Sequence, residues 1–243
     1  MDDEAYEAAQ SSAQSSAHGH RENEVLAEAR GGLIRPPASQ DAVARRVVEG
    51  DGPDILDEIW SPSCGVAVWR RNLDVEFRTW LDTLPPEDLP DARVVSSPSS
   101  AGSVLDAHIG GNGMAEGAFR TQLVEDAAML AGAFARIMKA TSVRIRLDVI
   151  SDDACRKFHL DNVEARLLCT YRGRGTQYGC SQGRSDPSPI HELETGDVGL
   201  FRGRRWPTLE QCGLVHRSPP LSAGEETRLL LVVDDGGPDM CGM

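Results

Sequence analysis

Residues 142–150 read Ser-Val-Arg-Ile-Arg-Leu-Asp-Val-Ile, and at this stretch the hydrophobic pattern of the chain changes. Apolar residues alternate with charged ones, and this period of two predicts a strand with one buried face. Further strand-like runs follow at 157–163, 166–171, 197–201, 213–215 and 227–233. Turns rich in glycine and proline separate these runs. Many short strands with such turns are typical of a β-barrel or a β-sandwich.

On the N-terminal side of this stretch the pattern favours helices. Helices are expected over 41–49, 73–81 and 115–140. In the first, Asp41 is the N-cap. In the second, apolar residues recur at i, i+4, i+7 and i+8, and Pro85–Pro86 stops the run. A short strand is expected at 94–95, and the glycine-rich stretch 110–113 is interpreted as a linker because it lacks the lysine of a phosphate-binding loop.

The composition, 40% hydrophobic and 26% charged residues, is that of a globular protein rather than a disordered one. Residues 1–40 are rich in Ala, Ser, Gln and Glu, and we expect a disordered N-terminal tail there, with His18 and His20 solvated. Residues 41–243 then form a single domain, in which 41–140 is the mainly helical part and 142–235 the β-rich core.

The formal net charge of −13 argues against a general binder of nucleic acid or of anionic membranes, because both need a basic surface. Between Arg156 and Arg228, however, eleven Lys and Arg stand against nine Asp and Glu, so this part of the chain is able to attract a small anion. The chain starts without the features of a secretion signal, and no apolar run approaches the ~20 residues of a membrane span. We therefore expect a cytoplasmic protein.

Six cysteines are scattered along the chain with no Cys-x-x-Cys pair. This spacing argues against a zinc ribbon or a thioredoxin-type site. Reduced, mostly buried thiols are expected.

The most informative segment for function is Phe158-His159-Leu160-Asp161. On an extended strand, residues i and i+2 project from the same face, so His159 and Asp161 point the same way. Alone the pattern is weak, since composition supplies about 0.5 such His-x-Asp triplets per chain by chance. A surface histidine paired with a carboxylate is the plainer alternative.

A second segment is Leu214-Val215-His216, a short apolar strand that ends in a histidine. The most apolar strand of the chain follows it and begins at Arg228. Two imidazoles and one carboxylate on one side of an octahedral ion leave the other positions open, which is the arrangement of non-haem Fe(II) oxygenases. A 2-oxo acid chelates such an iron through its keto-acid end. Its far carboxylate needs a planar, two-pronged donor, which arginine supplies.

With these motifs, the β-rich half resembles the iron(II)/2-oxoglutarate-dependent dioxygenase superfamily. The matching features are His159-x-Asp161, the distal His216, Arg228 after it, and the run 193–201, which is similar to a Gly-Asp turn and strand in the phytanoyl-CoA and prolyl hydroxylase branches. More narrowly, the segments Phe158–Tyr171 and His216–Val233 together resemble a bacterial family of unassigned function that we associate with zinc-starvation gene clusters. The resemblance implies an α+β fold, namely a double-stranded β-helix (jelly-roll) core with N-terminal helices packed on it.

The resemblance further implies that His159, Asp161 and His216 hold the metal and that Arg228 anchors 2-oxoglutarate. One position departs from the pattern. Many members of the superfamily place a serine or threonine two residues after the arginine, and this chain has Leu230 there. Thr170, Tyr171 or Thr176 are the candidates to replace that hydroxyl.

Two functions follow. The first is an Fe(II)/2-oxoglutarate-dependent oxygenase that hydroxylates a substrate, with a small 2-oxo acid as co-substrate and no nucleic-acid or membrane partner. The second is a non-catalytic jelly-roll protein that binds zinc in metal homeostasis, which Leu230 favours and in which Cys155 or Cys169 is a possible soft ligand.

Other candidate residues have plainer interpretations. His191, beside Glu192 and Glu194, is expected at a strand edge, and His108 in a loop. The basic and aromatic run Arg202–Trp206 either contacts an anionic substrate or caps a turn, and the sequence does not favour one over the other.

Overall fold

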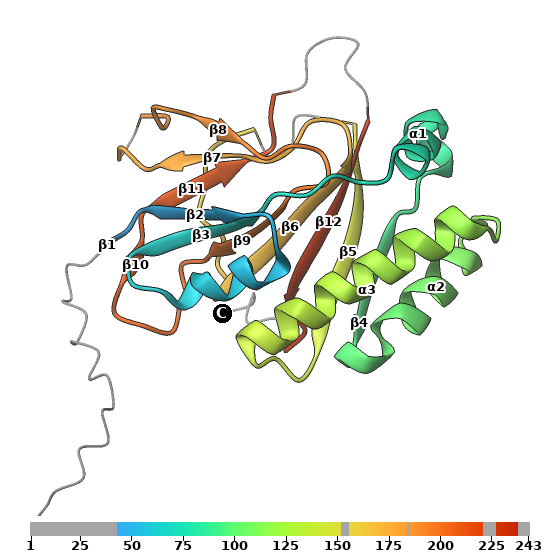
Figure 1. The fold of residues 1–243 in the computed structure, drawn as a ribbon, viewed down its shortest axis with the longest axis horizontal. Coiled ribbons are helices and arrows are strands. Elements are labelled where there is room, and N and C mark those ends of the chain that lie inside the picture. Colours follow the sequence, from blue (N-terminus) through green and yellow to red (C-terminus); the bar gives the residue numbers. More distant parts are fainter. Residues whose placement is uncertain (1–42, 152–155, 184, 221–226, 238–243) are drawn as a thin grey trace, which may run out of the picture. The chain divides into compact units, whose positions relative to one another are not determined.

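A computed structural model describes residues 43–151, 156–183, 185–220 and 227–237, and a large, mostly antiparallel sheet is its main feature (Figure 1). In spatial order its seven strands are β2 (Arg46–Gly50), β3 (Cys64–Trp69), β9 (Val198–Arg202), β6 (Ala165–Arg172), β12 (Arg228–Asp235), β5 (Val143–Ile150) and β4 (Ala92–Ser96). Only the β2–β3 pair among these neighbours is parallel.

A small sheet lies against one face of the large one. Its strands, in order, are β11 (Leu214–Arg217), β7 (Gln177–Cys180) and β8 (His191–Glu192). Buried apolar residues from both sheets form one cluster, in which Tyr178 and Leu214 of the small sheet meet Leu168, Phe201 and Leu230 of the large sheet. A separate parallel pair joins β1 (Val43–Ala44) to β10 (Gln211–Cys212). Two sheets around a shared apolar interior are consistent with the jelly roll that the sequence predicts.

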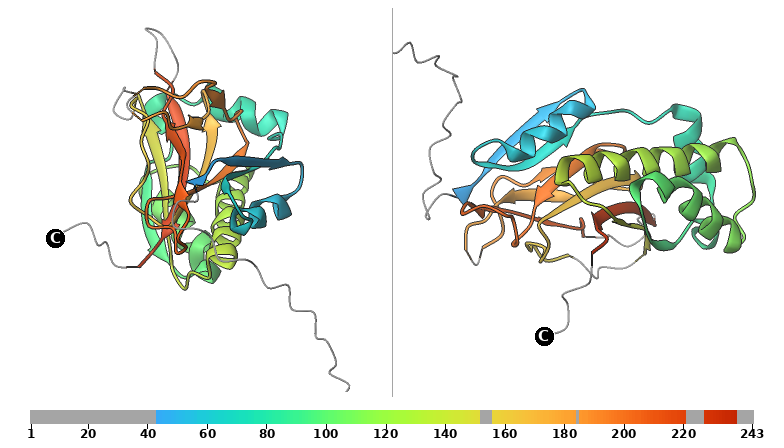
Figure 2. Two further views of the ribbon diagram at one scale, coloured as in Figure 1. Left: turned by 90° about the vertical axis from the view of Figure 1, so that its left-hand side faces the viewer. Right: turned by 90° about the horizontal axis from the view of Figure 1, so that it is seen from below.

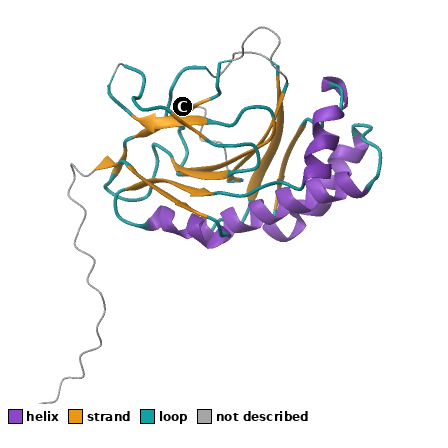
Figure 3. Ribbon diagram, turned by 45° about the horizontal axis from the view of Figure 1, so that its top comes forward, coloured by secondary structure: helices purple, strands orange, loops and turns teal. Residues whose placement is uncertain are grey.

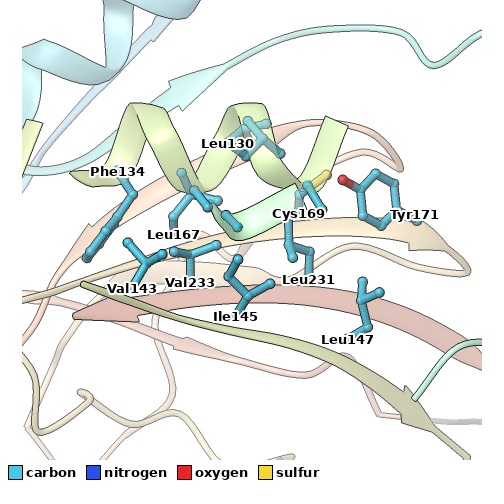
Figure 4. Packing of buried hydrophobic residues seen from close by; sticks show 14 of the residues in the cluster. Leu130, Phe134, Val143, Ile145, Leu147, Leu167, Cys169, Tyr171, Leu231 and Val233 are labelled. Atoms are coloured by element: carbon cyan, nitrogen blue, oxygen red, sulfur yellow. The ribbon is translucent and has the colours of Figure 1, made fainter. Parts of the chain in front are cut away.

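The helices gather on the opposite face of the large sheet (Figures 2 and 3). They are η1 (Pro53–Trp60), α1 (Val75–Thr83), η2 (Pro86–Asp88), η3 (Pro98–Ser100), α2 (Ala101–Gly111) and α3 (Ala118–Met138), of which the η elements are 3₁₀ helices. The second and larger apolar cluster lies between these helices and the sheet. In Figure 4, Leu130 and Phe134 of α3 lie over Val143, Leu167 and Val233.

The two clusters explain the sequence pattern of the central strands. In β12, Leu229, Leu231 and Val233 belong to the helix-side cluster, whereas Leu230 and Val232 belong to the cluster between the sheets. A strand that is buried on both faces reads as a continuous apolar run instead of an alternation. The apolar run near the C-terminus is therefore the signature of a central strand.

Several predicted elements agree with the structure. The helix expected over 73–81 is α1, for which the Asp74 side chain is the N-cap, accepting hydrogen bonds from the backbone N–H groups of Glu76 (2.9 Å) and Phe77 (3.0 Å). The short strand expected at 94–95 is the centre of β4. The runs expected after residue 142 include β5, β6, β9, β11 and β12.

Other predictions are wrong. The segment 43–50 forms strands instead of the expected helix, because Val47 and Val48 pair with β3. The run 157–163 is not a strand, and only His159 within it makes a β-bridge. Strands also precede residue 100, so the division into helices first and strands afterwards does not hold. Helix α2 was not expected, and it includes His108.

The tail predicted over 1–40 lies outside the described residues. The glycine-rich stretch 110–113 spans the end of α2 and the turn after it, where Gly113 has a φ of +97°. None of the helices in the described part of the chain combines the length and the hydrophobicity of a membrane span.

We predict that Leu231→Ala lowers the free energy of unfolding by about 2–5 kcal/mol, because Leu231 is fully buried at the centre of the large sheet. Val95→Ala is the control, since Val95 is 52% exposed on the edge strand β4 and its truncation should change stability by no more than about 0.5 kcal/mol. Urea unfolding of both variants measures the difference. Equal losses would mean that the sheet centre is not the core described above.

Candidate metal centre

A backbone bridge brings the two predicted histidine ligands together. His159 N–H donates to the His216 carbonyl oxygen at 3.0 Å, and His216 N–H donates to the His159 carbonyl oxygen at 3.0 Å. Residues that exchange both hydrogen bonds in an antiparallel pair project from the same face, and the two imidazole centroids are 4.8 Å apart. Asp161 follows His159 by two positions and lies on that face. One potential ligand atom from each of the three residues lies within 4.8 Å of the ligand atoms of the other two.

Two buried polar atoms in this group have no hydrogen-bond partner among the described residues, Asp161 Oδ2 and His216 Nδ1. Asp161 Oδ2 lies 3.0 Å from His216 Nε2, but this contact lacks hydrogen-bond geometry. Buried polar atoms are normally paired, so unpaired ones in a cluster of ligand-type groups point to a missing partner. A cation bound between Asp161 and His216 would supply the partner that Asp161 Oδ2 lacks.

The other histidine has a partner on the ring nitrogen that faces away from the group. His159 Nδ1 lies 2.9 Å from the Lys157 carbonyl oxygen, which can only accept. The proton is therefore assigned to Nδ1, and the lone pair of Nε2 is left for a metal. His159 Nε2 is 3.6 Å from Asp161 Oδ1.

Asp161 is ionised in this environment. Burial alone raises the pKa of its carboxyl group, but the imidazoles of His159 and His216 and the charge of Arg166 outweigh burial and hold the pKa well below its usual range. His159 shows the reciprocal effect, since its interaction with Asp161 raises the pKa of its imidazole above the ordinary value. A carboxylate that stays charged is the form that binds a metal.

His216 is held more firmly than His159. Its strand, β11, pairs with β7, where Tyr178 is its register partner, and the Phe201 ring packs 5.0 Å from its imidazole, centroid to centroid. The His216 side chain is 6% exposed and that of His159 is 40% exposed. The candidate centre is therefore buried on the His216 side and accessible to solvent on the His159 side.

Arg228, the predicted anchor for the 2-oxo acid, is fully buried at the start of β12. Its guanidinium donates to the Arg174 carbonyl oxygen (2.7 Å), to Ser218 Oγ (2.9 Å) and, at a longer 3.4 Å, to Thr170 Oγ1. Thr170 projects from the same face of β6 as Leu168, which belongs to the cluster between the sheets. Arg228 and Thr170 thus meet on the inner face of the large sheet.

The register of the sheet accounts for Leu230. Leu230 pairs directly with Thr170 across β12 and β6. A threonine hydroxyl is therefore present on the neighbouring strand, opposite the position two residues after Arg228.

Tyr171, predicted to help bind the cofactor, does not share a face with Thr170 and Arg228. Neighbouring residues of a strand point to opposite faces, so Tyr171 faces the helices while Thr170 faces the interior. Tyr171 is buried in the helix-side cluster, and its hydroxyl donates to Asp126 Oδ2 at 2.6 Å. Thr176, the other candidate, lies buried just before β7.

Cys169 is not a metal ligand either. It lies on the same face of β6 as Tyr171, within the helix-side cluster, while Cys155 is outside the described residues. The four described cysteines are all free thiols. Burial raises the pKa of Cys169 to about 12 and that of Cys64 to about 11.

The remaining candidates have structural roles. Arg202 is 1% exposed and donates to the carbonyl oxygens of Ile59 and Ser61 and to Glu210, while its guanidinium stacks on Trp206. The capping interpretation of the run Arg202–Trp206 is thus correct for Arg202. His191 lies on β8, at the edge of the small sheet as expected, and stacks on Tyr178.

The sequence did not point to three residues around the site. Ser218 contacts Arg228, and Arg166 contacts both Asp161 and Asp234. Arg166 and Thr170 lie on the same face of β6, because they are four positions apart on one strand. This period of two was the one sequence feature from which the place of Arg166 near the site could have been predicted. Asp234 lies 68 positions from Arg166 in the chain, and sheet register brings the two together.

The structure is a mixed α/β fold with a large, mostly antiparallel sheet that is consistent with a jelly roll, and it carries a candidate centre of two histidines and one carboxylate. A family model described as "Protein of unknown function (DUF1826)" matches residues 50–234, and the chain belongs to this family. No curated protein matches the chain.

Among solved structures, the chain is similar to an auxin-oxidation dioxygenase of Arabidopsis thaliana in complex with 2-oxoglutarate, with 10% identity, a TM-score of 0.48, and 82% of this chain and 95% of that chain covered. The dioxygenase for auxin oxidation in rice has 11% identity and a TM-score of 0.46, with 80% and 84% covered. A Pseudomonas putida prolyl-4-hydroxylase has 14% identity and a TM-score of 0.38, with 75% and 93% covered.

We predict that Cys64 and Cys169 do not react with a thiol reagent at pH 8 until the protein is unfolded. The thiolate is the reactive form, and pKa values of about 11 and 12 keep both groups protonated at that pH. Alkylation followed by peptide mass spectrometry, with and without denaturant, measures this for each cysteine. Labelling of Cys169 in the folded protein would contradict its place in the helix-side cluster.

We also predict that a divalent cation stabilises the protein through this centre. At a free concentration of 100 times its dissociation constant, an ion that binds only the folded state adds about 2.7 kcal/mol. Thermal unfolding with Mn(II) and with EDTA measures the gain, which Asp161→Ala and His216→Ala should abolish. His191→Ala, which removes a histidine from the edge of the small sheet, should keep it. An equal gain in all the variants would place the binding elsewhere.

Proposed function

We propose that the protein is an Fe(II)/2-oxoglutarate-dependent oxygenase that hydroxylates a second substrate. The observation that carries this proposal is the convergence of two histidines and one carboxylate, with a buried arginine close by in the fold. One potential ligand atom from each of His159, Asp161 and His216 comes together in one group. Ser218, two residues after His216, accepts a hydrogen bond from Arg228, which meets Thr170 on the inner face of the large sheet.

In this proposal, His159, Asp161 and His216 hold the iron. Two nitrogens and one carboxylate oxygen are a suitable donor set for Fe(II), and three protein ligands leave further positions open. An iron held there would supply the redox chemistry for oxidising a C–H bond of the substrate with O2 and the 2-oxo acid. The main-chain bridge between the histidines fixes the ligands before the metal arrives.

Arg228 binds the far carboxylate of 2-oxoglutarate. A guanidinium presents parallel donors that match a carboxylate, and the neighbouring hydroxyls of Ser218 and Thr170 are able to donate to the same group. Burial of Arg228 strengthens this recognition because little water competes there.

The apolar cluster between the sheets keeps water away from the reaction. Leu168, Leu230 and Val232 lie on the inner face of the two central strands, and Phe201 packs against His216. A site that excludes water protects reactive species from side reactions. The exposed edge of His159 leaves one side open to the second substrate.

We predict that the purified protein with Fe(II), under anaerobic conditions, gives the weak visible charge-transfer band of a chelated 2-oxo acid when 2-oxoglutarate is added. Arg228→Lys should lower the affinity for 2-oxoglutarate by about 10- to 100-fold, because lysine keeps the charge but loses a charge-assisted hydrogen bond of about 1.5–3 kcal/mol. Titration of the band measures both.

Arg205→Lys is the matched control, because Arg205 is exposed after β9 and the same change there should leave the affinity unchanged. A protein that binds Fe(II) but gives no band would contradict the proposal. So would an Asp161→Ala variant that still consumes 2-oxoglutarate in an iron-dependent manner.

A further inference from the structure

One guanidinium connects the candidate metal ligand Asp161 to a second buried carboxylate. Arg166 Nε and Nη2 donate to Asp234 Oδ1 and Oδ2 at 2.7 and 2.9 Å, and Arg166 Nη1 donates to Asp161 Oδ1 at 2.5 Å. Arg166 is on β6 and Asp234 on β12, so neighbouring central strands supply the two partners, and the loop before β6 supplies the third.

The two carboxylate oxygens of Asp161 have different surroundings. Oδ1 accepts from Arg166, whereas Oδ2 is buried, has no hydrogen-bond partner among the described residues, and lies 3.0 Å from His216 Nε2. A carboxylate that binds a metal through both oxygens needs both to face the ion. Here Oδ1 already accepts a charge-assisted hydrogen bond from Arg166, although His159 Nε2 also lies 3.6 Å from it, and Oδ2 is the oxygen without a hydrogen-bond partner among the described residues.

We propose that Arg166 is a positioning residue that restricts Asp161 to coordination through Oδ2 alone, with Asp234 as its anchor. The inference rests on the metal centre proposed above. Coordination through one oxygen occupies one position of the ion instead of two. With two imidazole nitrogens and one carboxylate oxygen bound, an octahedral ion would keep three positions for the two donor atoms of the 2-oxo acid and for O2.

The surroundings of Arg166 keep its guanidinium in place. Asp234 is 3% exposed, and its two carboxylate oxygens accept two parallel hydrogen bonds from the Arg166 guanidinium. This bidentate pair fixes both the plane and the direction of the guanidinium. Arg146 Nη2 lies 4.0 Å from Asp234 Oδ2 and adds a second cation to the same carboxylate. Lysine cannot reproduce this arrangement, because an ammonium has no planar fork to join two carboxylates at fixed angles.

Affinity for the metal does not explain the position of Arg166. A cation beside Asp161 repels a divalent ion, and Asp234 offsets that charge only in part, since it is also shared with Arg146. The contribution of Arg166 is instead to fix the orientation of the Asp161 carboxylate. Removal of a residue that orients a ligand costs typically 10- to 100-fold in metal affinity, whereas removal of a repelling charge raises affinity.

The experiment uses the full chain with Mn(II), a stand-in for Fe(II) that is stable in air. Electron paramagnetic resonance of free Mn(II) gives the dissociation constant. The metal-induced infrared difference spectrum gives the separation of the carboxylate stretches, which is wide for coordination through one oxygen and narrow for two. The variants are Arg166→Lys, which keeps the charge, and Asp234→Asn, which keeps Arg166 but weakens its anchor.

Wild type should show the wide separation, and both variants the narrow one with affinity at least about tenfold weaker. Arg204→Lys is the control: the Arg204 backbone N–H donates to the Asp161 carbonyl oxygen, but its side chain is exposed, so both readouts should match wild type. Circular dichroism and thermal unfolding with EDTA establish that each variant is folded.

The outcomes separate this inference from the proposed function. Variants that keep the wide separation and the wild-type affinity overturn the positioning role and leave the metal centre intact. Wild-type protein that binds no Mn(II) at this centre overturns the metal centre and the positioning role with it. Should Asp234→Asn not fold, Arg166→Lys alone decides, because it conserves charge and changes geometry.

Discussion

The two main-chain hydrogen bonds between His159 and His216 are the constraint on which the candidate site depends. Residues 157–163 form no strand, so no long ladder holds this segment to the sheet. The bridge fixes both imidazoles on one face, and the next residue of that face, Asp161, is held through its own carbonyl oxygen, which accepts from Arg204 N–H at 2.8 Å. Gly203 permits this close approach, since a Cβ there would lie 2.0 Å from the Val163 carbonyl oxygen. Three ligand-type groups thus meet because backbone contacts place them, before any metal is considered.

The large sheet separates structural from functional residues by its two faces. On β6, Leu167, Cys169 and Tyr171 turn to the helices and form the core, while Arg166 and Thr170 turn to the small sheet and meet the residues of the site. Each side chain's face follows from whether its position is odd or even. This is why a single step along the strand separates Thr170, beside Arg228, from Tyr171, which is bonded to Asp126. The helices of the first half therefore stabilise the sheet and leave its other face available for chemistry.

Much of this arrangement could be predicted from the sequence, and the failures have physical reasons. The alternation at 142–150 and the apolar run near the C-terminus are local signals, and both correspond to central strands. The segment 41–49 was misassigned because Val47 and Val48 satisfy a helical pattern as easily as a strand, and only pairing with β3 decides. The candidate ligand set came from residue types and spacing together with the resemblance to a superfamily, and the structure brings the three side chains together. The environment of that set could not be predicted in this way, because Arg166, Asp234 and Ser218 reach it through sheet register and loop paths that no short motif encodes.

Two arginines on one inner face illustrate how the neighbours of a side chain decide its task. Arg166 has its fork filled by the carboxylates of Asp161 and Asp234, so its charge orients a metal ligand and is not offered to a small molecule. Arg228, at the opposite end of β12 from Asp234, contacts the neutral hydroxyls of Ser218 and Thr170, which are able to share a carboxylate with it. The net charge of −13 therefore says little about the ligand. In the oxygenase proposed above, the buried Arg228 and the two hydroxyls beside it would select an anionic co-substrate.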